Sequence, residues 1–131
     1  MIKGVNSAFI WTGDFPRLMS FYRDTVGLEP EFEGEGFAMF KAATGAQLGV
    51  GLHSEVKGQS REPVRVMVNF TVDDCQAEYS RLSAKGVKFI KKPEVQPGDG
   101  GNLATFVDPD GNTLDLHHRY APPGEKPKAA K

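Results

Sequence analysis

The 131-residue sequence predicts an α+β fold made of two βαβββ modules. Two observations carry this prediction. First, the order strand, aspartate, amphipathic stretch, glycine and apolar run occurs twice, with Asp14 and Asp74 in equivalent places. Second, a strand, a turn and another strand follow in each half, with Gly45 and Gly111 in the turns. A pattern repeated in this way indicates one supersecondary unit used twice in the chain.

Each predicted helix has a start signal and a stop signal. Asp14 and Asp74 are natural N-caps, because a carboxylate there accepts hydrogen bonds from the free amides of the first turn. Gly27 and Gly86 can take the left-handed conformation that ends a helix. Between these signals lie the predicted core positions, which are Leu18, Met19 and Tyr22 in the first helix and Ala77, Leu82 and Ala84 in the second.

Three strands are predicted after each helix. "PEFEGE" and "VKFIKK" begin the two sets, and residues 37–53 then align with residues 103–119. This alignment places Gly49 opposite Asp115 and Gly51 opposite His117. The turn "DPDG" is the stronger of the two, because proline presets the first turn dihedral and glycine accepts a positive φ.

The predicted organisation is a single domain over residues 1–120, with modules at about 5–53 and 64–118. Residues 121–131 combine Pro, Gly, Lys and Ala without apolar periodicity, which predicts a flexible C-terminal tail. The polar stretch 53–63 is expected to cross the surface between the modules. The stretch "QPGDGG", residues 96–101, is expected to be a mobile flap.

Composition argues against several partners. Sixteen basic and seventeen acidic side chains give a net charge of −1 without a long block of either sign, so no nucleic acid partner is expected. No apolar run approaches the roughly 20 residues needed to span a bilayer, and no secretory leader is recognisable, so no membrane partner is expected. Cys75 is the single cysteine, which together with these features predicts a cytoplasmic protein.

Three segments of the chain resemble a known family. They are "GDFPRLMSFYRDTVGLEP", "VDDCQAEYSRLSAKGV" and "FVDPDGNTLDL". In combination they are similar to the vicinal oxygen chelate superfamily of glyoxalases, extradiol dioxygenases and bleomycin-resistance proteins, over about residues 5–118. The resemblance implies that the two modules form a curved, mostly antiparallel eight-stranded sheet around a cup. It does not imply one activity, because the same fold hosts isomerases, lyases, dioxygenases, transferases and drug-binding proteins.

The resemblance also implies where a metal would bind. In metal-dependent relatives, four ligands come from the first and last strands of the modules, and the equivalent positions here are Ser7, Gly49, Met67 and Asp115. A catalytic divalent metal needs three or four oxygen or nitrogen donors. Gly49 has no side chain, Met67 is a thioether, and Ser7 is a weak neutral donor. The sequence therefore predicts no usual metal site and no cofactor.

A shifted metal site is the alternative. Strand alternation places one set of last-strand residues on a single face of each module, namely Gln47, Gly49, Gly51 and His53, and Thr113, Asp115, His117 and Arg119. Asp115, His117 and His53, with Gln47, could meet at the mouth of the cup. A histidine at a strand end is nevertheless more often a partly exposed polar residue than a ligand. His118 points the other way and is expected at the surface.

The remaining inward positions predict a small-molecule pocket. From the first strands they are Ser7, Phe9 and Trp11 in one module, and Met67, Asn69 and Thr71 in the other. Gly49 and Gly51 are expected to leave space above the aromatic side chains. A concave apolar cavity with a few polar groups is the usual form of such a site. Phe9 and Trp11 are also well suited to ordinary core packing.

Asp115 carries the strongest indication of a functional role. A carboxylate that faces the middle of a curved sheet is costly unless it is paired, hydrated or used. Cys75 is not expected to be a nucleophile, because Asp73 and Asp74 disfavour the thiolate. No catalytic residue is assigned. The predicted ligand-binding residues are Ser7, Phe9, Trp11, Gly49, Gly51, Met67, Asn69, Asp115 and His117.

Two functions are consistent with these residues. The first is a metal-free protein that sequesters a partly aromatic small molecule, with Trp11 and Phe9 stacking on it and Asp115 pairing with a polar group. The alternative is a metal-dependent lyase, isomerase or dioxygenase of the same superfamily, with Asp115 as a ligand or general base. A homodimer is expected by resemblance, and because an open four-stranded sheet leaves edges that a second copy can cover.

Overall fold

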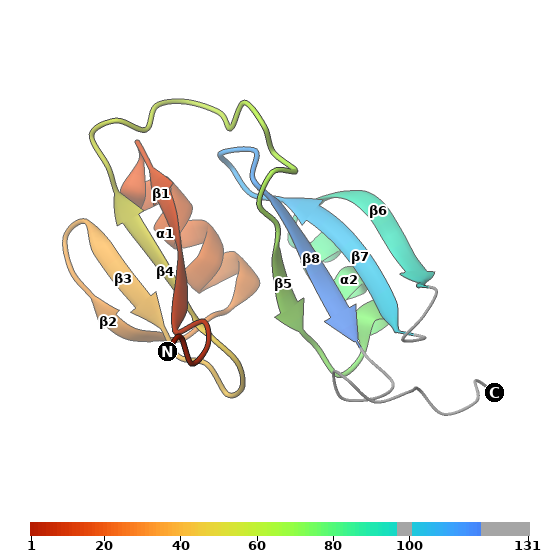
Figure 1. Ribbon diagram of the computed structural model, residues 1–131. Coiled ribbons are helices and arrows are strands. Elements are labelled where there is room, and N and C mark those ends of the chain that lie inside the picture. The colour runs from red at the N-terminus through yellow and green to blue at the C-terminus, as the bar shows by residue number, and fades with distance from the viewer. Residues whose placement is uncertain (97–100, 119–131) are drawn as a thin grey trace. The chain divides into compact units, whose positions relative to one another are not determined.

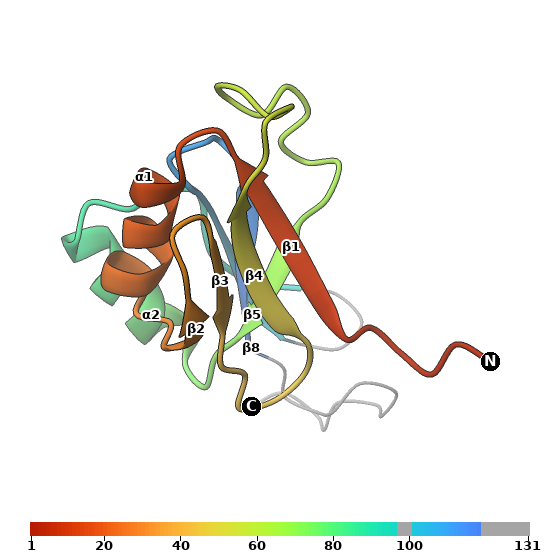
Figure 2. The same ribbon diagram turned by 90° about the vertical axis from the view of Figure 1, so that its left-hand side faces the viewer.

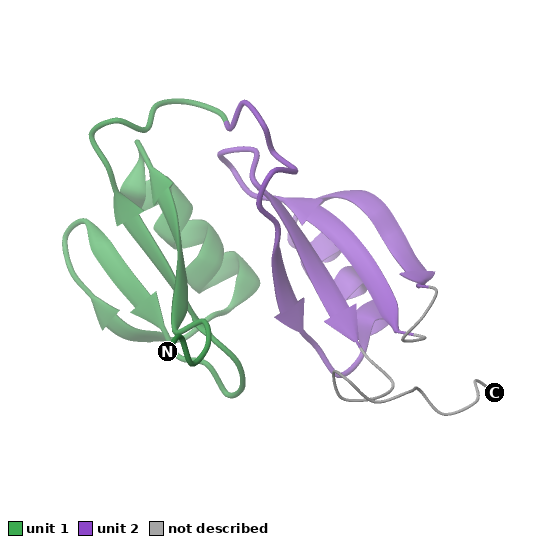
Figure 3. Ribbon diagram, in the orientation of Figure 1, with its two compact units in different colours: residues 1–59 green, residues 60–131 purple. Residues whose placement is uncertain are grey.

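The computed structural model describes residues 1–96 and 101–118 (Figure 1). The chain divides into two compact units, unit 1 at residues 1–59 and unit 2 at residues 60–131 (Figure 3). Arg119, the predicted tail 121–131 and most of the predicted flap 96–101 lie outside the described residues. In the part of the chain that is described, no helix is long and apolar enough to cross a membrane.

Unit 1 is a four-stranded sheet with one helical segment. Its elements are β1 (Ser7–Thr12), α1 (Phe15–Ser20), the π-helix η1 (Phe21–Val26), β2 (Pro30–Glu33), β3 (Phe37–Phe40) and β4 (Gln47–Leu52). The strand order is β1-β4-β3-β2, with β1 parallel to β4 and the other pairs antiparallel. Figure 2 shows α1 on one face of this sheet.

Unit 2 repeats the arrangement. Its elements are β5 (Val68–Thr71), α2 (Cys75–Ala84), β6 (Lys88–Val95), β7 (Asn102–Val107) and β8 (Thr113–His118). The strand order is β5-β8-β7-β6, and only β5 and β8 are parallel. The α+β class, the two βαβββ patterns and the mostly antiparallel pairing of eight strands are thus confirmed, with the strands in two four-stranded sheets.

The predicted helix signals are confirmed. The Asp14 carboxylate accepts a hydrogen bond from the backbone N–H of Arg17 at 3.3 Å. Asp74 accepts one from the N–H of Ala77 at 3.0 Å. Gly27 and Gly86 have φ values of 93° and 87°, so both take the left-handed conformation that ends each helix.

The first helical segment differs from a regular α-helix. From Phe21 onwards it is π-helical, and the N–H of Phe21 is shared between the carbonyls of Arg17 and Leu18. Both Tyr22 and Val26 are buried in this stretch. These two side chains, four residues apart, lie on the covered side of the helical segment.

The core lies between each helix and its sheet. In unit 1 the buried apolar strand residues are Ala38, Phe40, Leu48 and Val50, and in unit 2 they are Ala104, Phe106, Leu114 and Leu116. The prediction for the second helix was wrong at Ala77 and Ala84, which are exposed. Leu82 is buried there as predicted, while the ring of Tyr79 reaches Phe89 at a centroid distance of 4.7 Å. The alanine side chain is a single methyl group, which is too short to reach the sheet as the Tyr79 ring does.

Candidate functional site

The first strand of unit 1 places two aromatic side chains beside two glycines. In the parallel β1–β4 pair, Phe9 lies opposite Gly49 and Trp11 lies opposite Gly51. Their side chains point away from the sheet face that carries Leu48 and Val50, because successive strand residues alternate between faces. The sequence-predicted alternation in this unit is therefore confirmed.

The rings occupy the space that the glycines leave. A Cβ atom added at Gly49 would lie 2.5 Å from Cε2 of Phe9, and one added at Gly51 would lie 2.8 Å from Cε3 of Trp11. The expectation of open space above the aromatic side chains was thus wrong. The missing side-chain volume lets the rings lie down on the strand instead of leaving a hollow beside them.

The rings form a stacked, half-exposed surface. Phe9 and Trp11 stack at 5.5 Å with an interplanar angle of 11°, and Phe9 stacks on Phe37 at 5.5 Å and 23°. The imidazole of His53 meets the edge of Trp11 at 5.6 Å. Phe9 remains 38% exposed and Trp11 41% exposed. We call these four residues, Phe9, Trp11, Phe37 and His53, the aromatic face.

Large aromatic groups with this exposure offer a flat apolar surface. The faces of aromatic rings attract other aromatic rings in offset stacks and attract cations through the ring quadrupole. A flat compound placed on Phe9 or Trp11 would lose water from both partners. The aromatic face can therefore hold an aromatic or cationic group without any rearrangement of the strands.

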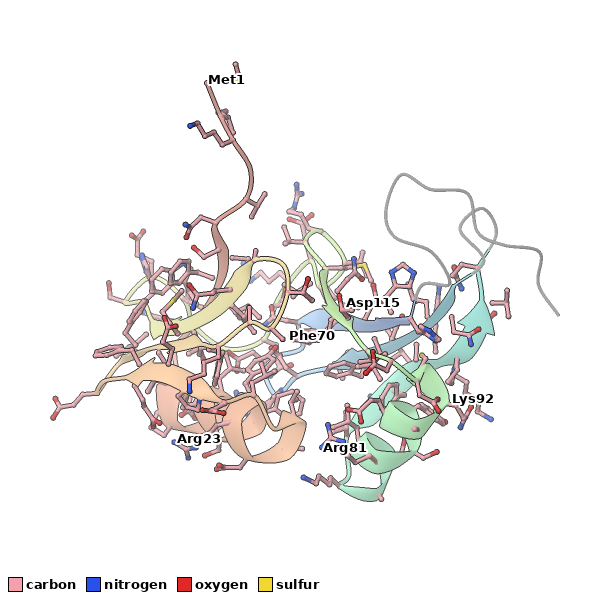
Figure 4. The ribbon with its side chains drawn as sticks, turned by 90° about the horizontal axis from the view of Figure 1, so that it is seen from below. Met1, Arg23, Phe70, Arg81, Lys92 and Asp115 are labelled. Atoms are coloured by element: carbon pink, nitrogen blue, oxygen red, sulfur yellow. The ribbon has the colours of Figure 1, made fainter. Side chains whose placement is uncertain are left out.

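The equivalent face of unit 2 is polar. Asp115 on β8 lies opposite Asn69 on β5 and opposite Thr105 on β7. The Thr105 hydroxyl donates a hydrogen bond of 2.6 Å to Oδ1 of Asp115. Both side chains are buried, and Asp115 is only 4% exposed. Figure 4 shows Asp115 on the side of this sheet away from the helix that carries Arg81.

His117 continues the same face of unit 2. It lies opposite Thr71 on β5 and opposite Leu103 on β7, and its side chain is half-buried. Asn69 and Thr71 are exposed. We call the set of Asn69, Thr71, Thr105, Asp115 and His117 the polar face. Its one buried carboxylate is stabilised by the charge-assisted bond from Thr105, which offsets part of the cost of burial.

Three further residues singled out in the sequence lie at or next to the starts of strands. Ser7 is half-buried at the start of β1, opposite Gln47. The Gln47 amide donates to the Phe40 carbonyl at 3.2 Å and to a carboxylate of β2, so it is already engaged. Met67 lies just before β5 and is 38% exposed.

The residues present do not fit the metal centre that the family implies. Of the four equivalent positions, only Asp115 supplies a strong oxygen donor, and its Oδ1 is held by Thr105. The shifted alternative is also weakened, because Nδ1 of His53 accepts the N–H of Glu55 at 3.1 Å. Within residues 1–96 and 101–118, no group of three or more His, Cys, Asp and Glu side chains is arranged to hold a metal.

Cys75 is buried under the sheet of unit 2. Its Sγ lies 3.8 Å from the carbonyl oxygen of Leu116. Burial raises the pKa of the Cys75 thiol, and the neighbouring charge of Asp74 raises it further. A thiol in this state is a poor nucleophile.

Two residues of these faces, Thr105 and Phe37, were not among the site residues predicted from the sequence. Thr105 could have been found, because a hairpin register centred on the "DPDGN" turn pairs it with Asp115. Phe37 could have been found in the same way, since β3 and β4 form a hairpin in which it lies opposite Gly51. The signal was the strand register rather than any motif.

The comparison with known proteins agrees with this architecture. The model of the Glyoxalase/Bleomycin resistance protein/Dioxygenase superfamily matches residues 4–116. The chain is 28% identical over 117 residues to an uncharacterized protein, YraH, of Bacillus subtilis, covering 79% of this chain and 89% of that one.

Similarity extends to a named enzyme and to a solved structure. Metallothiol transferase FosB of Shouchella clausii is 24% identical over 119 residues, covering 89% of this chain and 81% of FosB. The crystal structure of a superfamily member from Sphaerobacter thermophilus has a TM-score of 0.72 and 26% identity, covering 90% of this chain and 98% of that one. The chain belongs to the Glyoxalase/Bleomycin resistance protein/Dioxygenase superfamily.

Proposed function

We propose that this protein binds a flat, partly aromatic small molecule and sequesters it without a metal, in the manner of the bleomycin-resistance branch. One observation carries the proposal. Phe9 and Trp11 are stacked 5.5 Å apart, yet each remains about two-fifths exposed. Large aromatic rings held side by side at a surface are costly to hydrate and favour a ligand that covers them.

The aromatic face is prepared for binding before a ligand arrives. Gly49 and Gly51 seat the two rings against β4, and Phe37 and His53 contact them from the sides. Ordering of flexible side chains is a main cost of association, and this arrangement reduces it. A stacked aromatic pair contributes about 0.5–1.5 kcal/mol beyond the area that it buries.

The other predicted contacts remain part of the proposal. Ser7, Met67, Asn69, Asp115 and His117 are proposed to contact the ligand through hydroxyl, thioether, amide, carboxylate and imidazole groups. A few placed polar groups beside apolar ones orient a ligand and make its binding specific. We also propose that residues 1–120 act as one functional domain.

The proposal is tested with a matched pair of probes, 2-naphthalenemethanol and its saturated analogue decahydro-2-naphthalenemethanol. The indole N–H resonance of Trp11, the single tryptophan, reports binding at the aromatic face. We expect the flat probe to shift this resonance in a saturable manner and the saturated probe to bind at least several-fold more weakly.

Variants locate the binding. Phe9→Leu should weaken binding of the flat probe, whereas Ile90→Ala, which removes an apolar side chain that is 50% exposed in unit 2, should leave it unchanged. Equal binding of the two probes, or equal effects of the two variants, would show that general hydrophobic association and not the aromatic face is responsible.

A second candidate function is catalysis at Asp115. It is favoured by the burial of this carboxylate and its bond to Thr105, and by the similarity to a protein called metallothiol transferase. The donors do not fit a metal centre. Of the two roles considered for Asp115, metal ligand and general base, these residues therefore support the general base better. Turnover of a superfamily substrate that is lost in Asp115→Asn, with unchanged folding, would favour it.

We also propose that the protein is a cytoplasmic homodimer. The strands β1 and β5 each form one edge of their sheet, and β1 carries the exposed rings of Phe9 and Trp11. Exposed edges and apolar patches are the surfaces that a second copy covers. Light scattering after size exclusion should give twice the chain mass, and a monomer at working concentration would contradict this.

A further inference from the structure

The turn after β4 holds His53 beside the other rings of the aromatic face. The backbone N–H of His53 donates to the carbonyl of Thr12 at 3.1 Å, and the carbonyl of His53 accepts the N–H of Val56 at 3.1 Å. A Cβ atom added at Gly13 would lie only 2.6 Å from the carbonyl oxygen of Val56, so the turn lies directly against the residue that follows β1. The backbone of His53 is therefore fixed relative to Trp11, the neighbour of Thr12 on β1.

The imidazole of His53 is held in one tautomer. Its Nδ1 accepts the backbone N–H of Glu55 at 3.1 Å. A backbone N–H can only donate, so Nδ1 carries no proton, and the proton of the neutral imidazole is on Nε2. Nε2 is thus a hydrogen-bond donor at the edge of the ring that is farther from the backbone.

This donor is available to a ligand. In the part of the chain that the structure describes, Nε2 of His53 makes no hydrogen bond, and it is not an enclosed atom, so it reaches solvent. The imidazole is half-buried, and its plane makes an angle of 71° with the indole of Trp11 at a centroid distance of 5.6 Å. It therefore stands steeply beside the stacked rings of Phe9 and Trp11, with an unused N–H at its far edge.

We propose that the Nε2–H of His53 selects, among the flat ligands of the aromatic face, those that carry a neutral carbonyl oxygen. This inference rests on the function proposed above and names the class of its ligand. An aromatic ring stacked on Trp11 or Phe9 would present its carbonyl oxygen to the Nε2–H, whereas a donor group in that place would face another donor.

A neutral acceptor suits this position better than an anion. The charged side chain nearest to His53 along the chain is the exposed carboxylate of Glu55, which disfavours a second negative charge. Stacking alone tolerates many flat compounds, and a placed polar group is what orients a ligand and makes its binding specific. His53 would supply this specificity within unit 1 itself.

The test compares 2-acetylnaphthalene with 2-isopropenylnaphthalene, in which a methylene group replaces the carbonyl oxygen. The two probes share a flat ring system and nearly the same shape, but only the ketone accepts a hydrogen bond. The indole N–H resonance of Trp11 measures the binding of each probe. We expect both probes to bind, because both can stack on the rings.

Long-range proton–nitrogen spectra of the imidazole test the donor directly. In the protein without ligand they should show a protonated Nε2 and an unprotonated Nδ1 at His53. Addition of the ketone should shift the Nε2 resonance, and addition of the alkene should not, because only the ketone accepts the Nε2–H.

Two variants locate the effect. His53→Phe keeps a ring beside Trp11 but has no N–H, so it should weaken the ketone about two- to tenfold, the range for one hydrogen bond, and leave the alkene unchanged. His118→Phe makes the same substitution at the end of β8 in unit 2 and should change neither probe. Unchanged binding of the alkene also shows that the rings of the aromatic face are intact in His53→Phe.

The inference is overturned if His53→Phe weakens both probes equally, if His118→Phe weakens the ketone as much, or if Nδ1 of His53 carries the proton. Each of these outcomes leaves the aromatic face itself as a binding site. If neither probe shifts the Trp11 resonance, the proposed function fails and this inference fails with it. The two failures are therefore distinguishable.

Discussion

The indole ring of Trp11 lies over Gly51, in the volume that a side chain at that position would need. A Cβ atom at Gly51 would meet both Cζ3 and Cε3 of the indole, and Cδ1 of Phe37 would lie 3.4 Å from it. The exposed aromatic face thus depends on two residues without side chains, Gly49 and Gly51. Its shape is set by β4 as much as by the rings themselves.

Gly51→Ala is therefore expected to displace the indole and destabilise unit 1. Overpacking costs about 1–3 kcal/mol, and the half-exposed ring can move outward, so we expect about 1 kcal/mol. Urea unfolding followed by Trp11 fluorescence measures the loss, and the native emission should shift because the ring has moved.

Gly36→Ala is the matched control for this change. Its added Cβ would lie 3.6 Å from Leu52, an ordinary contact. The free energy of unfolding should change by less than about 0.5 kcal/mol. Equal effects of the two substitutions would mean that backbone flexibility, and not the close approach of the indole, explains the glycine at position 51.

The bond between Thr105 and Asp115 is expected to stabilise unit 2. Thr105→Val would leave a buried carboxylate without its donor, which costs about 1.5–3 kcal/mol. Asp115→Val would leave only a neutral hydroxyl and should cost less. In the double variant both polar groups are gone, so its loss should be smaller than the sum by about 1 kcal/mol or more.

Urea unfolding monitored by circular dichroism gives the four free energies of this cycle. Thr71→Val, on the same face but exposed, serves as the control and should be nearly neutral. Additive losses would show that the 2.6 Å contact does not couple the two side chains.

Much of the fold could be predicted because it depends on local signals. Asp14 and Asp74 cap their helices, and Gly27 and Gly86 end them, because capping and positive φ are properties of single residues and their neighbours. The π-helical turn at Phe21 had no such signal. A shift from i−4 to i−5 hydrogen bonding leaves no residue signature comparable to a cap or a positive φ.

The candidate site was less predictable for a similar reason. Alternation placed Phe9 and Trp11 on one face of β1 correctly. Whether the glycines beside them leave a hollow or receive the rings depends on rotamers, which alternation does not specify. The partner of Asp115 depended on the β7–β8 register, which places Thr105 beside it.

Cys75 is expected to make stability depend on pH. Burial, and to a smaller extent Asp74, raises the pKa of its thiol in the folded state above the usual value of about 8.5. The folded state then holds the proton more tightly, so this contribution is complete below the unfolded pKa and decreases as pH rises through the folded pKa.

The measurement compares the wild-type protein with Cys75→Ala from neutral pH to about pH 10, the range in which a thiol titrates. Unfolding is monitored by circular dichroism in reducing buffer. Wild-type stability should fall faster, by up to about 1.4 kcal/mol per pH unit above the unfolded pKa. If the free energies of unfolding of the two proteins changed with pH in parallel, burial would not raise the pKa of the Cys75 thiol in the folded state.

The carboxylate of Asp108 is expected to be the main stabiliser of the turn between β7 and β8. Its Oδ1 accepts the backbone N–H groups of Asp110 and Asn112, each at 2.9 Å. Its Oδ2 accepts the side-chain amide of Asn112 at 2.9 Å. Asp108→Ala leaves these donors unsatisfied at a buried position and should cost about 2–3 kcal/mol.

Asp108→Asn separates charge from geometry in this turn. An amide oxygen can still accept the two backbone donors, but without the charge that strengthens them, so its loss in urea unfolding should be intermediate. Asp73→Ala, at an exposed carboxylate in the same unit, should cost less than about 0.5 kcal/mol. If Asp108→Ala cost no more than this control, Pro109, Gly111 and the backbone hydrogen bonds of the turn would be sufficient to hold it. The backbone would then form it without the carboxylate, as it does where Gly45 turns at a φ of 76° in unit 1.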